Sequence, residues 1–182
     1  MTTIRRIIFF GGAFLDLAKV IIVLAILLIL VHLFIGTVFV VSGASMEPNF
    51  QNGQLVWSNK INYLTADPKR GDSVVVLYPG DPENKKYIKR VIGLPNETII
   101  LKDGRVYIAN ATSSEQALSE GYLDQVALTN PNGSWHLKSG EYFLMGDNRQ
   151  NSNDSRYFGA VERRFIFGKA TMILWPDFKS VN

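Results

Sequence analysis

One stretch of sequence limits what this chain can be: residues 20–41 contain no charged side chain. As a helix, these roughly 22 residues would span about 33 Å, which matches the ~30 Å hydrocarbon core of a bilayer. A buried helix of a soluble protein and a cleaved signal peptide are the alternatives. The apolar core of a signal peptide usually has only about 7–15 residues. We therefore expect residues 20–41 to form a single transmembrane helix.

The segment before this run is basic. It carries Arg5, Arg6 and Lys19 against a single acidic residue. Basic residues that flank a transmembrane helix usually stay in the cytoplasm. We expect residues 1–19 to be a cytoplasmic tail and residues 42–182 to form a domain outside the cytoplasmic membrane.

The overall charge does not indicate nucleic-acid binding. The formal net charge is +3, and part of the excess lies in the basic tail. From residue 42 onward the charges nearly cancel, without a dense basic patch of the kind that nucleic acid needs. The chain has no cysteine, which is compatible with an exported domain that lacks disulfides but does not establish one.

The remainder of the chain predicts strands separated by turns. Asp103-Gly104 lies between two apolar runs, which is a strong hairpin signal. We expect residues 96–140 to be a variable cap or insertion, because Ser, Asn and Gly recur from residue 110 onward. The predicted architecture is mainly β, an antiparallel and barrel-like domain on one N-terminal helix. The predicted strands cover residues 54–57, 73–77, 87–93, 98–101, 105–109, 142–145 and 165–175.

Ser45 stands in a turn of small residues directly after the apolar run. A nucleophilic serine needs a base, and the chain has only two histidines. His32 lies within the apolar run, and His136 follows an Asn/Pro/Gly-rich stretch that predicts an exposed loop. The G-x-S-x-G elbow is also absent. A histidine-based triad is therefore not indicated, and a lysine with a lowered pKa is the remaining base.

Lys89 is the lysine in an apolar strand. In an extended strand it shares a face with Tyr87 and Val91. Burying an ammonium is costly, so this position is unusual. A lysine at a strand edge, or one that reaches to solvent, is the structural alternative.

The loop at residues 146–159 alternates acidic and basic side chains. We expect Asp147 to pair with Arg149, and Asp154 with Arg156. A calcium loop is one alternative, but the spacing differs from an EF-hand and the arginines would repel the ion. A solvated loop is another. The dense pairing favours a structural support for a nearby site.

Four motifs, in this order and after a membrane-type segment, resemble the successive boxes of the bacterial type I signal peptidases. The resemblance covers the chain from the apolar run to residue 159, apart from residues 96–140. The motifs are Ser45-Met46-x-Pro48, Gly71-Asp72-x-Val74-Val75, Tyr87-Ile88-Lys89-Arg90-Val91-Ile92-Gly93-Leu94-Pro95, and Gly146-Asp147-Asn148-Arg149 with Asp154-Ser155-Arg156 and Gly159.

The resemblance implies a fold like that of the signal peptidases and the LexA-type repressors. It also implies a Ser-Lys dyad, with Ser45 as the nucleophile and Lys89 as the general base. Further residues of the loop would support the dyad: Ser152 orients the lysine, Asp154 and Arg156 form a salt bridge, and Asp147 and Arg149 brace the loop.

The chain departs from the usual family pattern in places. Asn49 replaces a common threonine, Asn96-Glu97 replaces a Gly-Asp pair, and Gln150 replaces an aspartate. Gly43 stands where some members carry a serine that helps to bind the oxyanion. The backbone N–H of Ser45 would then carry more of that role.

The implied activity is removal of signal peptides from exported preproteins after small residues, through an acyl-enzyme. Val41, Val75 and Ile88 are the expected walls of shallow substrate pockets. The expected partners are preprotein signal peptides and the lipid bilayer, with the secretion translocon as a further candidate and no nucleic acid; no cofactor or metal is expected. A self-cleaving repressor of the same fold group and an anchored scaffold with an inactive site are the rival functions.

Overall fold

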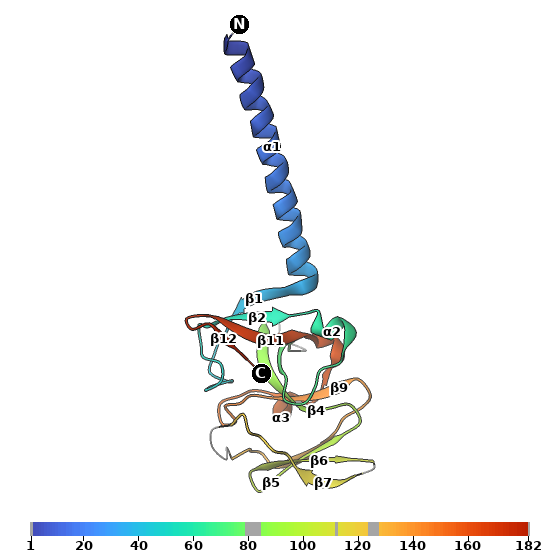
Figure 1. The fold of residues 1–182 in the computed structure, drawn as a ribbon. Helices are drawn as coiled ribbons and strands as arrows, with labels where there is room; N and C mark the ends of the chain where they lie inside the picture. Colours follow the sequence, from blue (N-terminus) through green and yellow to red (C-terminus); the bar gives the residue numbers. More distant parts are fainter. Residues whose placement is uncertain (1, 79–84, 112, 124–127, 182) are drawn as a thin grey trace. The chain divides into compact units, whose positions relative to one another are not determined.

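The computed structural model describes residues 2–78, 85–111, 113–123 and 128–181, with side chains from Phe14 onward apart from residue 33. The side chains of Arg5 and Arg6, and parts of the predicted 96–140 segment, therefore lie outside the described residues. The chain divides into a first unit that ends at Gly36 and a second unit that begins at Thr37. Figure 1 traces both units along the chain.

The first unit is a helix whose end differs from the predicted one. Helix α1 (Thr2–Leu30) continues into the π-helical turn η1 (Val31–Ile35), and strand β1 (Gly36–Val40) follows. The expected helix over residues 20–41 is therefore too long at its C-terminal end. β1 consists largely of β-branched and aromatic residues, which favour a strand when a partner strand is available, and it pairs with β2 (Leu55–Asn59).

Among the described residues, no helix reaches the length and apolar character needed to cross a membrane.

The second unit consists mainly of antiparallel strands in two sheets, as the sequence predicts. The larger sheet has eight strands in the order β1-β2-β11-β3-β4-β9-β10, with β12 paired to β11, and it curls as a half-barrel. The smaller sheet has the order β7-β6-β5-β8. The remaining elements are α2 (Asn62–Thr65), β3 (Ser73–Leu77), β4 (Lys86–Gly93), β5 (Thr98–Lys102), β6 (Arg105–Asn110), β7 (Ser113–Ala117), β8 (Gly133–His136), β9 (Glu141–Met145), α3 (Ser155–Phe158), β10 (Val161–Glu162), η2 (Arg163–Phe165), β11 (Ile166–Trp175) and β12 (Lys179–Ser180).

Strand β4 contributes to all three clusters of the hydrophobic core. Ile88 packs near β1 and β2, Val91 packs with β3, β9 and β10, and Ile92 packs against the smaller sheet. Successive side chains of a strand point to opposite faces, so β4 can serve clusters on both sides. This central position buries most of the strand.

The residues from 96 to 140 are more regular than expected. The predicted hairpin is present as β5 and β6, and both Asp103 and Gly104 in its turn have positive φ (52° and 72°), as a tight hairpin turn requires. β7 and β8 add to its two sides. His136 lies on β8 and not in the predicted loop. On this strand its Nδ1 is 3.1 Å from Thr98 Oγ1. Polar strands of this kind lack the apolar alternation that reveals a strand.

Candidate active site

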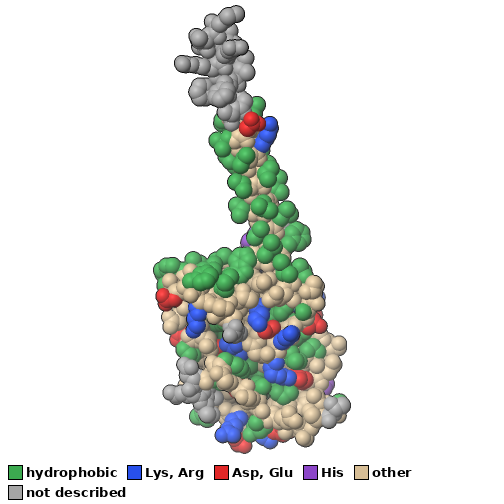
Figure 2. Space-filling view, viewed as in Figure 1, with side chains coloured by type: hydrophobic (Ala, Val, Ile, Leu, Met, Phe, Trp, Pro, Cys, Tyr) green, Lys and Arg blue, Asp and Glu red, His purple; other side chains and the backbone are tan. Residues whose placement is uncertain are grey.

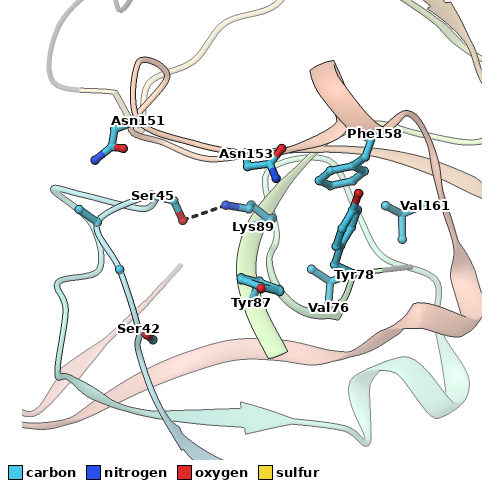
Figure 3. A pocket seen from close by; sticks show the side chains of 12 residues that line it. Ser42, Ser45, Val76, Tyr78, Tyr87, Lys89, Asn151, Asn153, Phe158 and Val161 are labelled. Carbon is cyan, nitrogen blue, oxygen red and sulfur yellow. Dashed lines mark hydrogen bonds between the residues drawn. The ribbon is translucent and has the colours of Figure 1, made fainter. Parts of the chain in front are cut away.

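Ser45 and Lys89 meet in the second unit. Lys89 Nζ lies 2.8 Å from Ser45 Oγ and 3.0 Å from Ser152 Oγ, and Figure 3 shows the Ser45–Lys89 contact. Ser45 stands in the turn after β1, Lys89 on β4, and Ser152 in the loop after β9. Three segments far apart in the sequence therefore place three polar side chains within hydrogen-bonding distance.

The apolar surroundings of β4 make Lys89 a strong candidate for a base. Lys89 is only 4% exposed, and its cross-strand partner on β3 is Val74. Burial lowers the pKa of Lys89 from 10.5 to about 8, with a smaller opposing effect from the Asp154 carboxylate. Among the described ion pairs, none includes Lys89. With this pKa about one-tenth of the amine is neutral at pH 7, and the neutral form is the one that can accept a proton.

Gly146 permits the close approach of the loop to Ser45. A Cβ atom at this position would lie 2.3 Å from Ser152 Oγ and 2.4 Å from the Ser45 carbonyl oxygen, so only glycine fits. Two residues further, the Asn148 backbone N–H donates to the Ser45 carbonyl (3.1 Å), and its side-chain amide donates to the Ala44 carbonyl (3.2 Å). The loop therefore fixes the backbone of the serine turn through these two hydrogen bonds.

Asp154 and Arg156 form the predicted pair. Arg156 Nε and Nη2 donate to the two Asp154 carboxylate oxygens, each at 2.8 Å, and both side chains are fully buried. Burial alone would raise the pKa of Asp154, but the hydrogen bonds from Arg156 and from the Gly146 N–H outweigh it and lower that pKa. Arg156 also donates to the Ser152 carbonyl at 3.3 Å. The pair thus fixes the backbone that carries Ser152.

Asp147 and Arg149 do not pair with each other as predicted. Arg90, on β4, donates from Nε and Nη2 to the two Asp147 oxygens at 2.7 and 2.6 Å. Arg149 instead donates to Glu120, in the segment between β7 and β8. A planar guanidinium prefers two parallel bonds to one carboxylate. The fold brings such partners from other segments, so the sequence-local pairing was wrong.

Asn49 joins three segments that the sequence does not connect. Its side-chain amide donates to Asp147 Oδ2 and to the Tyr122 carbonyl oxygen, both at 2.8 Å. The Tyr122 ring also lies 4.2 Å from the Arg90 guanidinium carbon. The sequence marked Asn49 as a departure from the family pattern but gave no signal for this contact. The structure places it between the serine turn, the loop and residue 122.

Each acidic side chain of the loop has an arginine partner, which leaves the calcium-loop alternative without support. Asp147 binds Arg90, and Asp154 binds Arg156. A calcium ion would have to displace these buried guanidinium groups. The arrangement is that of a rigid support rather than an ion site.

Two cavities that are lined by described residues border Ser45. The smaller encloses about 10 Å³ beside Val41 and Ile88, which are two of the three predicted pocket walls. The larger encloses about 380 Å³ and extends past Lys89. Val75, the third predicted wall, is buried and lines neither of these two cavities. It is the cross-strand neighbour of Ile88 and therefore lies one strand further from Ser45.

Comparisons with known proteins give a consistent result. The family described as "Signal peptidase, peptidase S26" matches residues 14–175. Signal peptidase I of Bacillus licheniformis is 36% identical over 163 residues, covering 87% of each chain. Signal peptidase I of Bacillus amyloliquefaciens is 36% identical and covers 91% of this chain and 90% of its own. Signal peptidase I of Pseudomonas aeruginosa is 34% identical and covers 79% of this chain and 67% of its own.

Proposed function

Since this chain belongs to the signal peptidase family, peptidase S26, we propose that it is a serine endopeptidase that removes signal peptides from exported preproteins with a Ser-Lys dyad. The observation that carries the proposal is the 2.8 Å contact between Lys89 Nζ and Ser45 Oγ. Neither histidine is needed for it. His136 contacts Thr98 on the smaller sheet.

In the proposed reaction, neutral Lys89 takes the hydroxyl proton of Ser45 while Ser45 Oγ attacks the scissile carbonyl carbon. The carbon–nitrogen bond then breaks, and Lys89 returns the proton to the leaving amine. This step leaves an ester between Ser45 Oγ and the signal peptide. A water molecule then gives a proton to Lys89 while its oxygen attacks the ester carbonyl. The bond to Ser45 Oγ breaks, Lys89 returns the proton to Ser45 Oγ, and the signal peptide leaves with a new carboxyl group. Ser152 accepts a hydrogen bond from Lys89 Nζ and thereby keeps the amine directed at Ser45.

The backbone N–H of Ser45 is the proposed donor for the oxyanion. Among the described residues it donates no hydrogen bond to another group, so it is available to a developing negative charge. Gly43, two residues earlier, has no side-chain hydroxyl to add. The main-chain donor then carries this role without help from that position.

The smaller cavity supports a preference for small residues before the scissile bond. It encloses about 10 Å³ between the serine turn and β4, beside Val41 and Ile88. A large side chain would not enter without displacing buried core residues. We propose that this cavity receives the signal-peptide side of the substrate.

We also propose that the first unit anchors the enzyme to the cytoplasmic membrane with its N-terminus inside. Large apolar side chains from Val20 to Leu30 are exposed around α1, as Figure 2 shows for the described part of the helix. A helix that is apolar all round requires an apolar environment. Protease added outside spheroplasts should cleave the chain between residues 110 and 140. Protection of that segment until the membrane is breached would contradict this orientation.

The catalytic proposal is tested by substituting its two central residues. Ser45→Ala and Lys89→Ala should each abolish cleavage of a preprotein by the detergent-solubilised full chain, and the double variant should be no worse than either single one, because residues that act as one unit are not additive. His136→Ala is the control and should be near normal. Loss of activity in the control, or cleavage by either of the two single variants, would disprove the dyad.

A further inference from the structure

The larger cavity at Ser45 has no role in the chemistry described so far. It encloses about 380 Å³ and is lined by Ser45 and Lys89 at one end and mainly by apolar side chains beyond them. Figure 3 shows Lys89 between Ser45 and an aromatic pair, Tyr78 and Phe158, whose ring centroids are 4.4 Å apart. Val76 and Val161 complete this apolar end. The space is large enough for an aromatic side chain, and pockets with such linings bind apolar groups.

The position of Lys89 decides which part of a substrate faces this cavity. Lys89 lines the larger cavity but not the smaller one. The base that removes the serine proton must deliver it to the leaving amine nitrogen. That nitrogen belongs to the first residue after the scissile bond. The leaving side of the substrate must therefore lie on the Lys89 side of Ser45.

The smaller cavity leads to the same assignment from the other direction. Both cavities are lined by Ser42, Gly43, Ser45 and Tyr87, so they are two separate spaces that adjoin at the nucleophile. A peptide whose carbonyl is held at Ser45 must send its two halves to different sides. The cavity of about 10 Å³ admits only small groups, which suits the residues before the scissile bond. The larger one is left for the residues after it.

We propose that the cavity formed by Val76, Tyr78, Phe158 and Val161 binds an apolar or aromatic side chain from the first two residues after the scissile bond. This proposal rests on the proposed peptidase function. It adds a specificity site on the mature side of the preprotein, with Phe158 as its aromatic wall. Lys89 is the only charged residue that lines the cavity among the described residues, so apolar side chains fit it better than charged ones.

The test uses the full chain in detergent with peptides that are identical before the scissile bond. The peptides carry Ala, Leu, Phe or Asp at the first or the second position after that bond. For wild type, kcat/KM should be roughly tenfold higher for Leu or Phe than for Ala at one of these positions, since burying even one extra methylene in an apolar pocket is worth about tenfold or more. Phe158→Ala should remove most of the preference for Phe over Ala.

The matched control is Phe167→Ala, another aromatic truncation. Phe167 is 39% exposed on β11, lies beneath the Lys86 ammonium and lines neither cavity. This variant should keep the wild-type preference. An equal kcat/KM for all four peptides at both positions, or an unchanged preference in Phe158→Ala, would overturn the specificity site.

A second measurement needs no variant. Added phenylalaninamide and glycinamide compete with water for the acyl-enzyme: the amine nitrogen attacks the ester carbonyl, the bond to Ser45 Oγ breaks, and the amine proton passes through Lys89 to Ser45. Alanylphenylalaninamide and alanylglycinamide probe the second position in the same way. In at least one of the two pairs, the amine that contains phenylalanine should be the better acceptor by roughly tenfold. Equal partition in both pairs would contradict the proposal. If no peptide is cleaved at all, the proposed peptidase function fails instead, so the two failures are distinguishable.

Discussion

The pH dependence of cleavage offers the most direct test of Lys89 as the base. Burial lowers the pKa of Lys89 to about 8, and only the neutral amine accepts a proton. At pH 7 about one-tenth of the enzyme would then be active, against roughly 1 in 3,000 if the lysine kept its ordinary pKa of 10.5. Burial is therefore worth about three hundredfold in activity at pH 7.

The assay is kcat/KM for an internally quenched peptide with Ala before the scissile bond, measured from pH 6 to pH 10. This quantity reports the pKa values of the free enzyme. We expect the rate to rise about tenfold from pH 7 to pH 9 and then to level off. An ordinary lysine would give a rise of about a hundredfold over the same interval, without a plateau.

Two results would refute the reasoning. A midpoint near 6.5 would indicate a histidine base, and a rate that still increases in proportion to hydroxide at pH 10 would mean that Lys89 is not buried as the structure shows. Lys89→Arg is the companion variant and should be inactive at every pH, because a guanidinium does not lose its proton in this range. Activity in that variant would exclude Lys89 as the base.

Three further predictions concern stability. The folded pKa of Lys89 is lower than its ordinary value, so the unfolded chain binds more protons between about pH 8 and 10.5, and the contribution of this group to stability rises with pH in that window. Lys89→Met should therefore raise the free energy of unfolding at pH 7 by up to about 3 kcal/mol while abolishing activity. An unchanged or lower melting temperature would contradict this. Asp154→Asn should lower both kcat and the melting temperature, because it removes the charge that compensates a buried arginine; wild-type turnover would rule out the bracing role. Glu120→Gln should lower the free energy of unfolding by about 1–3 kcal/mol, because it weakens the ion pair with buried Arg149. Glu115→Gln, in a more exposed ion pair, should lower it by less than about 1 kcal/mol. Equal losses in chemical denaturation would contradict this difference.

The local sequence was sufficient for the elements whose signal lies within a few residues. The β-branched run at Ser73–Leu77 forms β3, and Asp103-Gly104 forms the turn between β5 and β6. Alternation along β4 placed Lys89 on the face of Tyr87 and Val91, which share one core cluster. These features follow from backbone geometry that repeats every two residues, so no distant contact was needed to predict them.

The tertiary structure decided the contacts whose partners are far apart in sequence. Arg90 binds Asp147 57 residues away, and Arg149 binds Glu120 29 residues away. Likewise, the helix ends at Leu30 and η1 at Ile35 because the following residues find a strand partner in β2. The candidate site residues could be predicted from the sequence, because each is indicated by its own side chain and by the motif around it. Their pairing, and the cavity beside Lys89, depend on which strands become neighbours, and that is set by the packing of the whole domain.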